Sequence, residues 1–303
     1  MKVINLGSIN IDHVYCVEHF VKPGETLRSK RYQVFAGGKG ANQSIALARA
    51  GTEVFHAGKI GKDGLWLKDK LQNSKVDTTL IKTSHEPTGH AVIQVNDEGE
   101  NAIVIYGGAN DSFLDEEIED VLRHTEKGDF LVLQNEINSL EKILQLSKKR
   151  GVRVIFNPAP MNEKVKSYPL ECVNTFIINA LEGEMLTGED DPEKIVSSMQ
   201  DRYPQSTTVL TLGKKGLIYR DENTKIKMDA LEVKSIDTTG AGDTFIGYFV
   251  AGLAQEESIE KCLQMGVKAS ALCVGCQGAA DSIPTREEVE NFNAAARRTL
   301  YSE

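Results

Sequence analysis

The sequence lacks long hydrophobic runs. No apolar stretch approaches the roughly 18 residues that a membrane-spanning helix requires. The first residues, MKVINLGSINIDHVY, include Asp12 and no long apolar core, so they do not resemble a secretory signal peptide. We therefore expect no membrane association and a cytoplasmic protein.

Cysteine is scarce and scattered, which argues against a disulfide framework and for a reducing compartment. The five cysteines are Cys16, Cys172, Cys262, Cys273 and Cys276. The last two form a C-x-x-C pair, but no second pair follows at a similar spacing, as a structural zinc site would require. We interpret both as buried or backbone-determined residues.

Clusters of basic residues are also absent. The net charge is −9 with a pI near 5.3, and no segment has the basic run typical of nucleic-acid binding. The hydrophobic fraction of 40% is sufficient for a large core. Because we find no repeat, linker or low-complexity segment, we expect residues 1–303 to form a single domain.

Short apolar runs alternate with helical patterns along most of the chain. The runs do not alternate strictly, as is typical of strands buried on both faces of a sheet. Strand followed by helix, repeated, predicts an α/β fold with a mostly parallel sheet. The expected strands are 2–7, 53–61, 129–134, 152–160, 175–180 and 207–213. The expected helices are 40–50, 64–74, 115–126, 139–150, 191–203, 241–254, 257–272 and 285–298.

Two segments, residues 9–35 and 88–106, instead alternate polar and apolar residues with period two, and a hairpin turn is expected at 97–99. They predict a small antiparallel sheet over the main body, which is either a lid or an edge hairpin. A lid exposes one apolar face unless a ligand or a second copy covers it, so a homodimer is one expectation.

Near the C-terminus, Thr239-Gly240-Ala241-Gly242-Asp243 precedes an apolar helix. Small residues allow close approach of a ligand, and the free amides of a helix start bind phosphate oxygens. Asp243 then lies beside an anion hole, within reach of a hydroxyl that attacks phosphorus. The alternative is an acidic residue that stabilises the first helical turn through the helix dipole.

A second glycine-rich stretch covers residues 36–51. It fits neither a P-loop nor G-x-G-x-x-G, but it forms a tight turn into a helix, with Lys39 and Asn42 beside it. Gly37 and Gly38 indicate either a nearby ligand or a purely structural turn.

Polar residues also follow several expected strands, where ligands bind in open α/β sheets. They are Asn10, Asp12, Glu136, Asn179 and Glu182. Carboxylates such as Asp12 can accept hydrogen bonds from adjacent sugar hydroxyls. Each residue alone is better explained as a satisfied loop residue, and their recurrence at strand ends is the stronger signal.

The two glycine motifs, GGKGANQ and DTTGAGDTF, resemble the paired signatures of the ribokinase-like (PfkB-type) carbohydrate kinases. Further matches are GSINIDH at 7–13, PGET at 23–26, TGHAV at 88–92, NPAP at 157–160, N-x-x-E at 179–182, TLGKKG at 211–216 and GAADSIP at 278–284. This resemblance implies a three-layer α/β/α fold with a central, mostly parallel sheet and a β-lid that closes over a sugar and makes a dimer contact.

The resemblance also implies residue roles. Sugar binding falls to Asn10, Asp12, Gly38, Lys39, Asn42 and Glu136, and the catalytic base is Asp243. Amides from Gly240, Ala241, Gly242 and Asp243 form the anion hole. ATP binding falls to Asn179, Thr211, Leu212, Gly213, Gly216 and Gly242. Glu182 acts on Mg²⁺ through water, and a monovalent cation, K⁺, is bound near Asp237, Thr239, Cys273, Cys276, Gly278 and Ser282, mostly through carbonyl oxygens.

We therefore expect ATP-dependent phosphorylation of a primary hydroxyl on an unphosphorylated sugar, with D-ribose converted to D-ribose 5-phosphate as the first candidate. Two carboxylates, Asp12 and Glu136, argue against a sugar that already carries phosphate. The alternatives are a nucleoside, a ketohexose or another pentose as substrate. From a different class, a sugar-binding regulator without catalysis is the remaining alternative.

Overall fold

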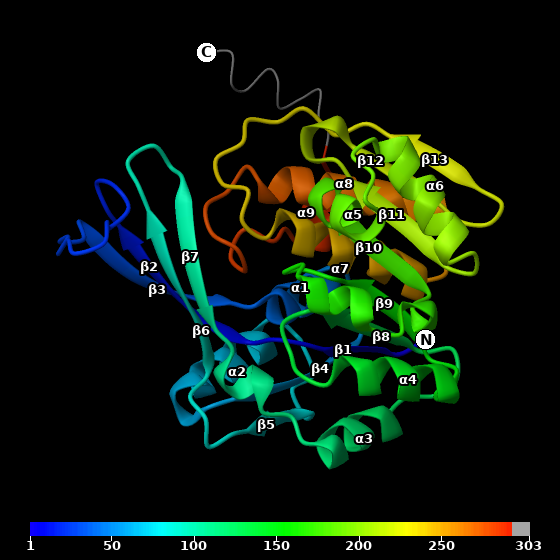
Figure 1. Ribbon diagram of the computed structural model, residues 1–303, viewed down its shortest axis with the longest axis horizontal. Helices are drawn as coiled ribbons and strands as arrows, with labels where there is room; N and C mark the ends of the chain where they lie inside the picture. Colours follow the sequence, from blue (N-terminus) through cyan, green and yellow to red (C-terminus); the bar gives the residue numbers. More distant parts are fainter. Residues whose placement is uncertain (293–303) are drawn as a thin grey trace.

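The computed structural model describes residues 1–292, and its core is a nine-stranded sheet in the order β13-β12-β11-β10-β9-β8-β1-β4-β5 (Figure 1). All neighbours from β11 to β5 pair in parallel, whereas β11, β12 and β13 pair antiparallel. The strands are β1 (Val3–Leu6), β4 (Val54–Ile60), β5 (Ile81–Thr83), β8 (Phe130–Gln134), β9 (Arg153–Asn157), β10 (Thr175–Asn179), β11 (Thr207–Thr211), β12 (Leu217–Arg220) and β13 (Lys225–Met228).

Helices cover both faces of this sheet, because successive strand residues point to opposite sides. Val3 packs into one hydrophobic cluster and its neighbour Ile4 into the other. The first cluster includes residues of α1 (Lys39–Arg49), α2 (Leu65–Asn73), α7 (Ala241–Ala254), α8 (Ile259–Cys273) and α9 (Arg286–Glu290). The second includes residues of α3 (Asp115–Arg123), α4 (Leu140–Arg150), α5 (Ala180–Thr187) and α6 (Pro192–Arg202). The expected three-layer α/β/α fold is confirmed.

The sequence missed α5, β5 and the β12–β13 hairpin. Helix α5 begins at Asn179, whose side chain accepts a hydrogen bond from Glu182 N while the Glu182 carboxylate accepts from Asn179 N. This capping box starts the helix, whereas the sequence indicated only that both residues follow a strand, as ligands or as satisfied loop residues. The helix expected at 285–298 ends at Glu290 in the structure, and residues 293–298 lie outside the described residues.

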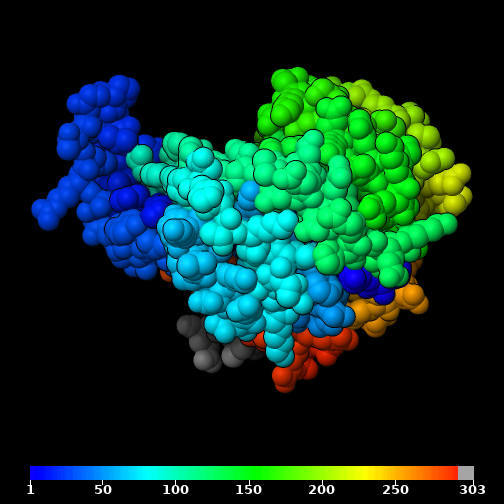
Figure 2. Space-filling model, turned by 90° about the horizontal axis from the view of Figure 1, so that it is seen from below, coloured from blue at the N-terminus to red at the C-terminus, as the bar shows by residue number. Residues whose placement is uncertain are grey.

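A second sheet of four strands, in the order β3-β2-β6-β7, is built from the two alternating segments. The strands are β2 (Asn10–Cys16), β3 (Arg31–Gly37), β6 (Gly89–Val95) and β7 (Asn101–Tyr106). Two antiparallel pairs, β2–β3 and β6–β7, are joined by parallel pairing of β2 with β6. The sheet projects from the main body in Figure 1, and Figure 2 shows a hollow beside it. We call it the projecting sheet.

Helices α1 and α7 lie in close contact because α7 contains a glycine at the crossing. A Cβ at residue 247 would lie 2.3 Å from the Ala46 Cβ and 2.9 Å from Leu47 N. At the start of α1, Gly38 has φ of 90°, and a Cβ there would lie 2.9 Å from Asn10 N. The two glycine motifs, about 200 residues apart in sequence, therefore meet.

No helix within residues 1–292 is both long enough and apolar enough to cross a membrane.

Candidate active site

The carboxylate of Asp243 lies in the first turn of α7, buried against the first turn of α1. Its Oδ2 accepts a hydrogen bond from Asn42 Nδ2 over 3.0 Å, and its Oδ1 accepts one from Gln43 Nε2 over 2.9 Å. Burial raises the pKa of Asp243 above its ordinary value, although Lys39 and the two amide donors act to lower it. Asp243 is therefore held between two motifs, which a simple helix-dipole role does not require.

The amides of the first turn of α7 have no acceptor within the helix. Ala241 N donates to Thr238 O over a long 3.3 Å. Gly240, the N-cap, has φ of 77°, a conformation that favours glycine. A Cβ at Gly242 would meet no atom within 4 Å, so this residue borders open space. The geometry leaves room for an anion at this helix start.

Further acidic groups surround Lys39 beside Asp243. Glu136 Oε2 accepts from Ser8 Oγ over 2.5 Å and from Lys39 N over 3.0 Å. Burial, reinforced by the charge of Glu136, raises the pKa of Asp12 to about 7. Burial also raises the pKa of Glu136, and although burial lowers that of Lys39, the surrounding carboxylates raise it overall. Residues distant in sequence, from β2, the segment after β8 and the starts of α1 and α7, thus supply one charged cluster.

Asn110, which the sequence analysis missed, fixes the orientation of Asn10. Asn110 lies in a short 3₁₀ helix (Gly108–Asp111) and donates from Nδ2 to Asn10 Oδ1 over 2.7 Å, while its Oδ1 accepts from Ile9 N. The side-chain oxygen of Asn10 is thereby occupied, and its NH₂ group remains the group it can offer to a ligand. No motif or periodic pattern in the sequence indicated a role for Asn110.

One face of the projecting sheet adds apolar groups beside Asp12. Register places Asp12 opposite Ala91, and Ala91 opposite Ile105; Ile93 lies two residues further along β6 on that same face. Ile105 is 50% exposed. The sequence showed the period-two pattern, but only the register between strands identifies which residues share a face with Asp12.

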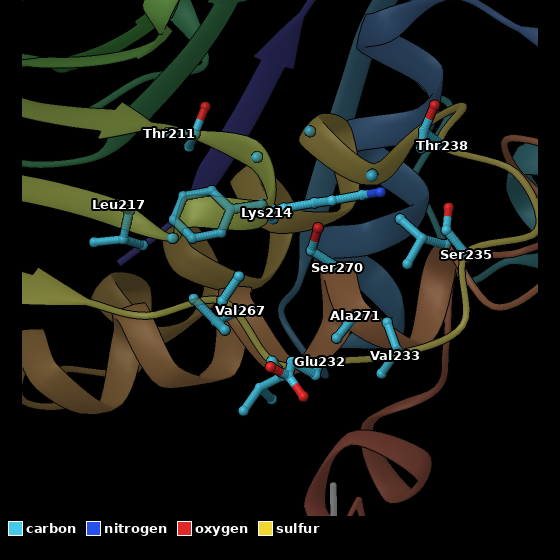
Figure 3. A pocket seen from close by; sticks show the side chains of 18 residues that line it. Thr211, Lys214, Leu217, Glu232, Val233, Ser235, Thr238, Val267, Ser270 and Ala271 are labelled. Atoms are coloured by element: carbon cyan, nitrogen blue, oxygen red, sulfur yellow. The ribbon is translucent and has the colours of Figure 1, made fainter. Parts of the chain in front are cut away.

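A cavity of about 420 Å³ lies on the other side of the start of α7 (Figure 3). Thr211, Gly213, Gly216 and Gly242 line it, as expected for the nucleotide side, whereas Leu212 and Asn179 are not among its lining residues. Apolar side chains form much of the wall, a feature the sequence did not reveal because they come from a loop without regular pattern and from two helices, α7 and α8. They include Val233, Phe245, Val267, Ala271 and Val274.

Asn179 and Glu182 bind each other in the capping box at the start of α5. Asn179 Nδ2 also donates to Glu182 Oε1 over 2.9 Å. Burial raises the pKa of Glu182, and its charge acts on Lys39. Within the described residues, no cluster of three or more His, Cys, Asp or Glu is placed to hold a metal.

The residues expected near a monovalent cation come together in one loop cluster. Asp237 accepts from Thr239 N over 2.9 Å and from Gly278 N over 2.9 Å. Although burial acts in the opposite direction, these hydrogen bonds lower the pKa of Asp237. Cys273 Sγ lies 3.0 Å from Ser282 Oγ. Carboxylate and carbonyl oxygens are hard donors, and the sequence places several of them in this loop, while the Asp237 carboxylate itself contacts N–H and hydroxyl donors.

Cys276 lies in the turn directly after α8, with its N–H donating to Cys273 O over 3.0 Å. Its side chain is exposed, whereas that of Cys273 is buried. Cys273 is therefore a buried residue, whereas Cys276 makes its contact through the backbone and not through its side chain.

Comparison with known proteins identifies the family. The model of the pfkB family carbohydrate kinases matches residues 1–286. The chain belongs to this family. The resemblance inferred from the glycine motifs is thereby confirmed, and so is the carbohydrate-kinase class.

Ribokinases are among the relatives of this pfkB-family kinase. Ribokinase of Haemophilus influenzae is 39% identical over 297 residues, which cover 95% of this chain and 96% of the relative. Ribokinase of Staphylococcus aureus is 38% identical over 304 residues, covering 95% and 98%. The structure of Arabidopsis thaliana ribokinase complexed with ribose and ATP has a TM-score of 0.84 at 30% identity, covering 96% and 99%.

The raised pKa of Asp12 predicts a pH-dependent stability cost in this kinase. Between about pH 4 and pH 7 the folded protein binds the Asp12 proton more tightly than the unfolded chain does, so the free energy of unfolding falls as the pH rises. We expect Asp12→Asn, without ligands, to raise the Tm relative to wild type by about 2 °C or more at pH 8. Near pH 4 this difference should be smaller.

Thermal unfolding at several pH values measures this effect. Asp69→Asn, at an exposed position in α2, is the matched control. Its Tm difference from wild type should not increase between pH 4 and pH 8. A Tm difference between Asp12→Asn and wild type that stays constant from pH 4 to pH 8 would contradict the prediction.

Proposed function

We propose that this chain is an ATP-dependent kinase that transfers the γ-phosphoryl group to the primary hydroxyl of D-ribose, giving D-ribose 5-phosphate. The ribokinase relatives, which align over nearly the whole chain, support this substrate. The observation that carries the mechanism is the position of Asp243, which is buried between the acidic cluster around Lys39 and the cavity that reaches Gly242.

The sugar side offers groups that suit several hydroxyls. Asp12 and Glu136 accept hydrogen bonds, and Lys39 and the NH₂ group of Asn10 donate them. Asn42 Oδ1 is buried and has no hydrogen-bond partner among the described residues, so it can accept from a hydroxyl. Two carboxylates repel a phosphate group, which favours an unphosphorylated sugar. Gly38, at the turn, allows the sugar to approach the backbone.

The nucleotide side combines an apolar wall with a helix start. The cavity of about 420 Å³ has the size and lining expected of a small-molecule site. In this proposal ATP lies along Thr211, Gly213 and Gly216 with its phosphates directed to Gly242. Asn179 and Leu212 contribute to ATP binding from the margin of the cavity. Leu212 N donates a hydrogen bond to Gly216 O there over 2.8 Å.

The reaction follows from these two sides. A carboxylate oxygen of Asp243 takes the proton of the primary hydroxyl as that oxygen forms a bond to the γ-phosphorus. The bond from phosphorus to the β–γ bridging oxygen breaks, and ADP leaves with the electron pair. Amides of Gly240, Ala241, Gly242 and Asp243 stabilise the charge on the transferring group, which is the main need of phosphoryl transfer.

Two metal ions complete the proposal. Glu182, whose carboxylate is buried at the start of α5, would act on the hydration shell of Mg²⁺, which would supply positive charge to the phosphates. Asp237, Thr239, Cys273, Cys276, Gly278 and Ser282 would hold K⁺, mostly through carbonyl oxygens. This loop adjoins the start of α7, since Ala279 lies beside Gly240, so a cation held there would support the anion hole.

Residues 1–303 act in this proposal as one catalytic domain, with the segments 9–35 and 88–106 as its lid. The lid face that carries Asp12, Ala91, Ile93 and Ile105 covers the sugar. The opposite face carries further exposed apolar residues, which are Tyr32, Val34, Val92, Val104 and Tyr106. Because one surface faces the sugar, the other is left for a second copy of the chain, which gives a homodimer.

The dimer can be tested by sedimentation equilibrium. We expect wild type to sediment as a dimer and Val104→Lys to shift it toward monomer, because Val104 is 71% exposed and a charge there opposes burial. Leu114→Lys, at the start of α3 and 56% exposed, is the control and should remain dimeric. A monomeric wild type would refute the dimer without affecting the kinase assignment.

The substrate can be tested by coupled measurement of ADP release. The panel contains ribose, deoxyribose, fructose, other pentoses and several nucleosides, with K⁺ present or replaced by Na⁺. We expect the highest kcat/KM for ribose and a lower rate in Na⁺. If ribose is no better than the others, the ribose assignment is wrong, and if no compound supports ADP release, a non-catalytic sugar-binding protein becomes the better interpretation.

The role of Asp243 can be tested by Asp243→Asn. The amide keeps the size of the side chain but cannot accept the hydroxyl proton, so we expect kcat to fall by at least about 10²-fold. Binding of ATP and sugar, measured by calorimetry, should be retained. A variant with wild-type kcat would remove Asp243 from the chemistry.

A further inference from the structure

A continuous chain of buried hydrogen bonds leads from Asp243 into the centre of the main sheet. Gln43 Nε2 donates to Asp243 Oδ1, and Gln43 Oε1 accepts from Gln134 Nε2 over 2.7 Å. Gln134 Nε2 also donates to Asn5 Oδ1 over 3.0 Å. Gln43, Gln134 and Asn5 are fully buried, and they belong to α1, β8 and β1, so the chain joins elements that are distant in sequence.

A backbone carbonyl fixes the direction of donation along this chain. Asn5 Nδ2 donates to Gly40 O over 2.8 Å. Because a carbonyl oxygen only accepts, Asn5 must present its NH₂ group there and its oxygen to Gln134. Gln134 must then present its NH₂ group to both Asn5 and Gln43. Gln43 is left with its NH₂ group directed at Asp243.

The orientation of the Gln134 side chain has a free-energy cost. This cost indicates a role for the residue beyond linking α1 to the sheet. Its Oε1 is buried and has no hydrogen-bond partner among the described residues, and an unpaired buried oxygen is unfavourable. The side chain fits only because residue 7 is glycine, since a Cβ there would lie 2.1 Å from Gln134 Oε1. In this orientation Gln134 donates two hydrogen bonds, to Asn5 and Gln43, while its own oxygen is left without a donor.

We propose that Gln134 is a positioning residue for phosphoryl transfer, which acts through Gln43 by holding that amide so that it donates to Asp243. The donated hydrogen bond stabilises the ionised, proton-accepting form of the carboxylate and fixes its orientation. Gln134 touches neither Asp243 nor the sugar side in this proposal. The inference rests on the proposed role of Asp243 as the base.

The other charged groups around Asp243 do not replace this effect. Lys39 stabilises the ionised carboxylate, whereas Asp12, Glu136 and Glu182 oppose it. None of them is changed in the variants below. At the far end of the chain, Ser44 Oγ accepts from Asn5 and lies 2.8 Å from His56 Nδ1.

Burial lowers the pKa of His56 to about 4, so the histidine stays neutral over the working pH range. The acidic limb of the pH profile therefore reflects groups of the candidate active site and not His56, which lies at the far end of the hydrogen-bond chain.

The test is the dependence of kcat on pH, with ribose and ATP saturating, between about pH 5 and pH 9. Gln43→Met removes the donor, so we expect the acidic limb to move to higher pH by about one unit, with a loss of about 10-fold below the limb and recovery at alkaline pH. Gln134→Met should move the limb in the same direction, by less. The double variant should move it no further than Gln43→Met alone, because both act on one hydrogen bond.

Gln255→Met is the matched control. Gln255, at the other end of α7, donates to Ala50 O and Thr52 Oγ1 just beyond α1, each over 3.2 Å. Its loss removes the same kind of link between the same two helices, so the acidic limb should stay in place even if the Tm falls. An unshifted limb in Gln134→Met, or a shift that adds to that of Gln43→Met, overturns the proposal.

A second variant covers the case in which Gln134→Met does not fold. Gln134→Glu keeps the size of the side chain and, when protonated, one donor, which cannot serve both Asn5 and Gln43. We expect the same upward shift of the limb, and its absence refutes the role of Gln134. Asp243→Asn separates the two hypotheses: if it retains turnover, the base assignment fails, whereas an inactive Asp243→Asn with an unshifted Gln134 variant removes only the positioning role.

Discussion

The close contact between the starts of α1 and α7 is the constraint on which the site depends. Gly247 allows the two helices to approach until the Asp243 carboxylate lies within hydrogen-bond distance of two successive α1 residues, Asn42 and Gln43. Each side chain uses its NH₂ group, so both carboxylate oxygens are acceptors. A wider helix spacing would leave a buried charge unpaired, which is far more costly than a lost surface contact.

This contact also explains how the negatively charged side chain of Asp243 and amides that attract anions can occur at the same helix start. Ala241 and Gly242 at the start of α7 line the cavity, whereas the Asp243 side chain is held by Asn42 and Gln43 of α1. The carboxylate therefore does not compete for the amides. Its neighbours Asp12 and Glu136 have raised pKa values in the protein alone. In the proposed complex, hydroxyl donors from the sugar would offset that cost.

The sequence predicted the parts of this arrangement that local patterns encode. Buried strands, period-two segments and glycine turns each have a local signature, and the carboxyl ends of parallel strands necessarily gather at one edge of the sheet. Gln134 and Asn110 carry no such signature. The contacts of Gln134 depend on which strands lie beside β8 and on an amide orientation set by the carbonyl of Gly40. Those of Asn110 depend on a contact with residues about 100 positions away. Neither can be predicted from neighbouring residues in the sequence.

The position of the projecting sheet has a consequence for the proposed chemistry. Ile105 is half exposed on the face that carries Asp12, and the sheet stands away from the main body (Figure 2). In the proposed mechanism, water could reach the position of the sugar hydroxyl in that arrangement, and a base beside an anion hole would equally activate water for ATP hydrolysis. Closure of the apolar face over the sugar would exclude that water and strengthen each electrostatic contact inside. In the proposed mechanism, the apolar residues opposite the charged cluster are therefore as necessary for selective transfer as Asp243 itself.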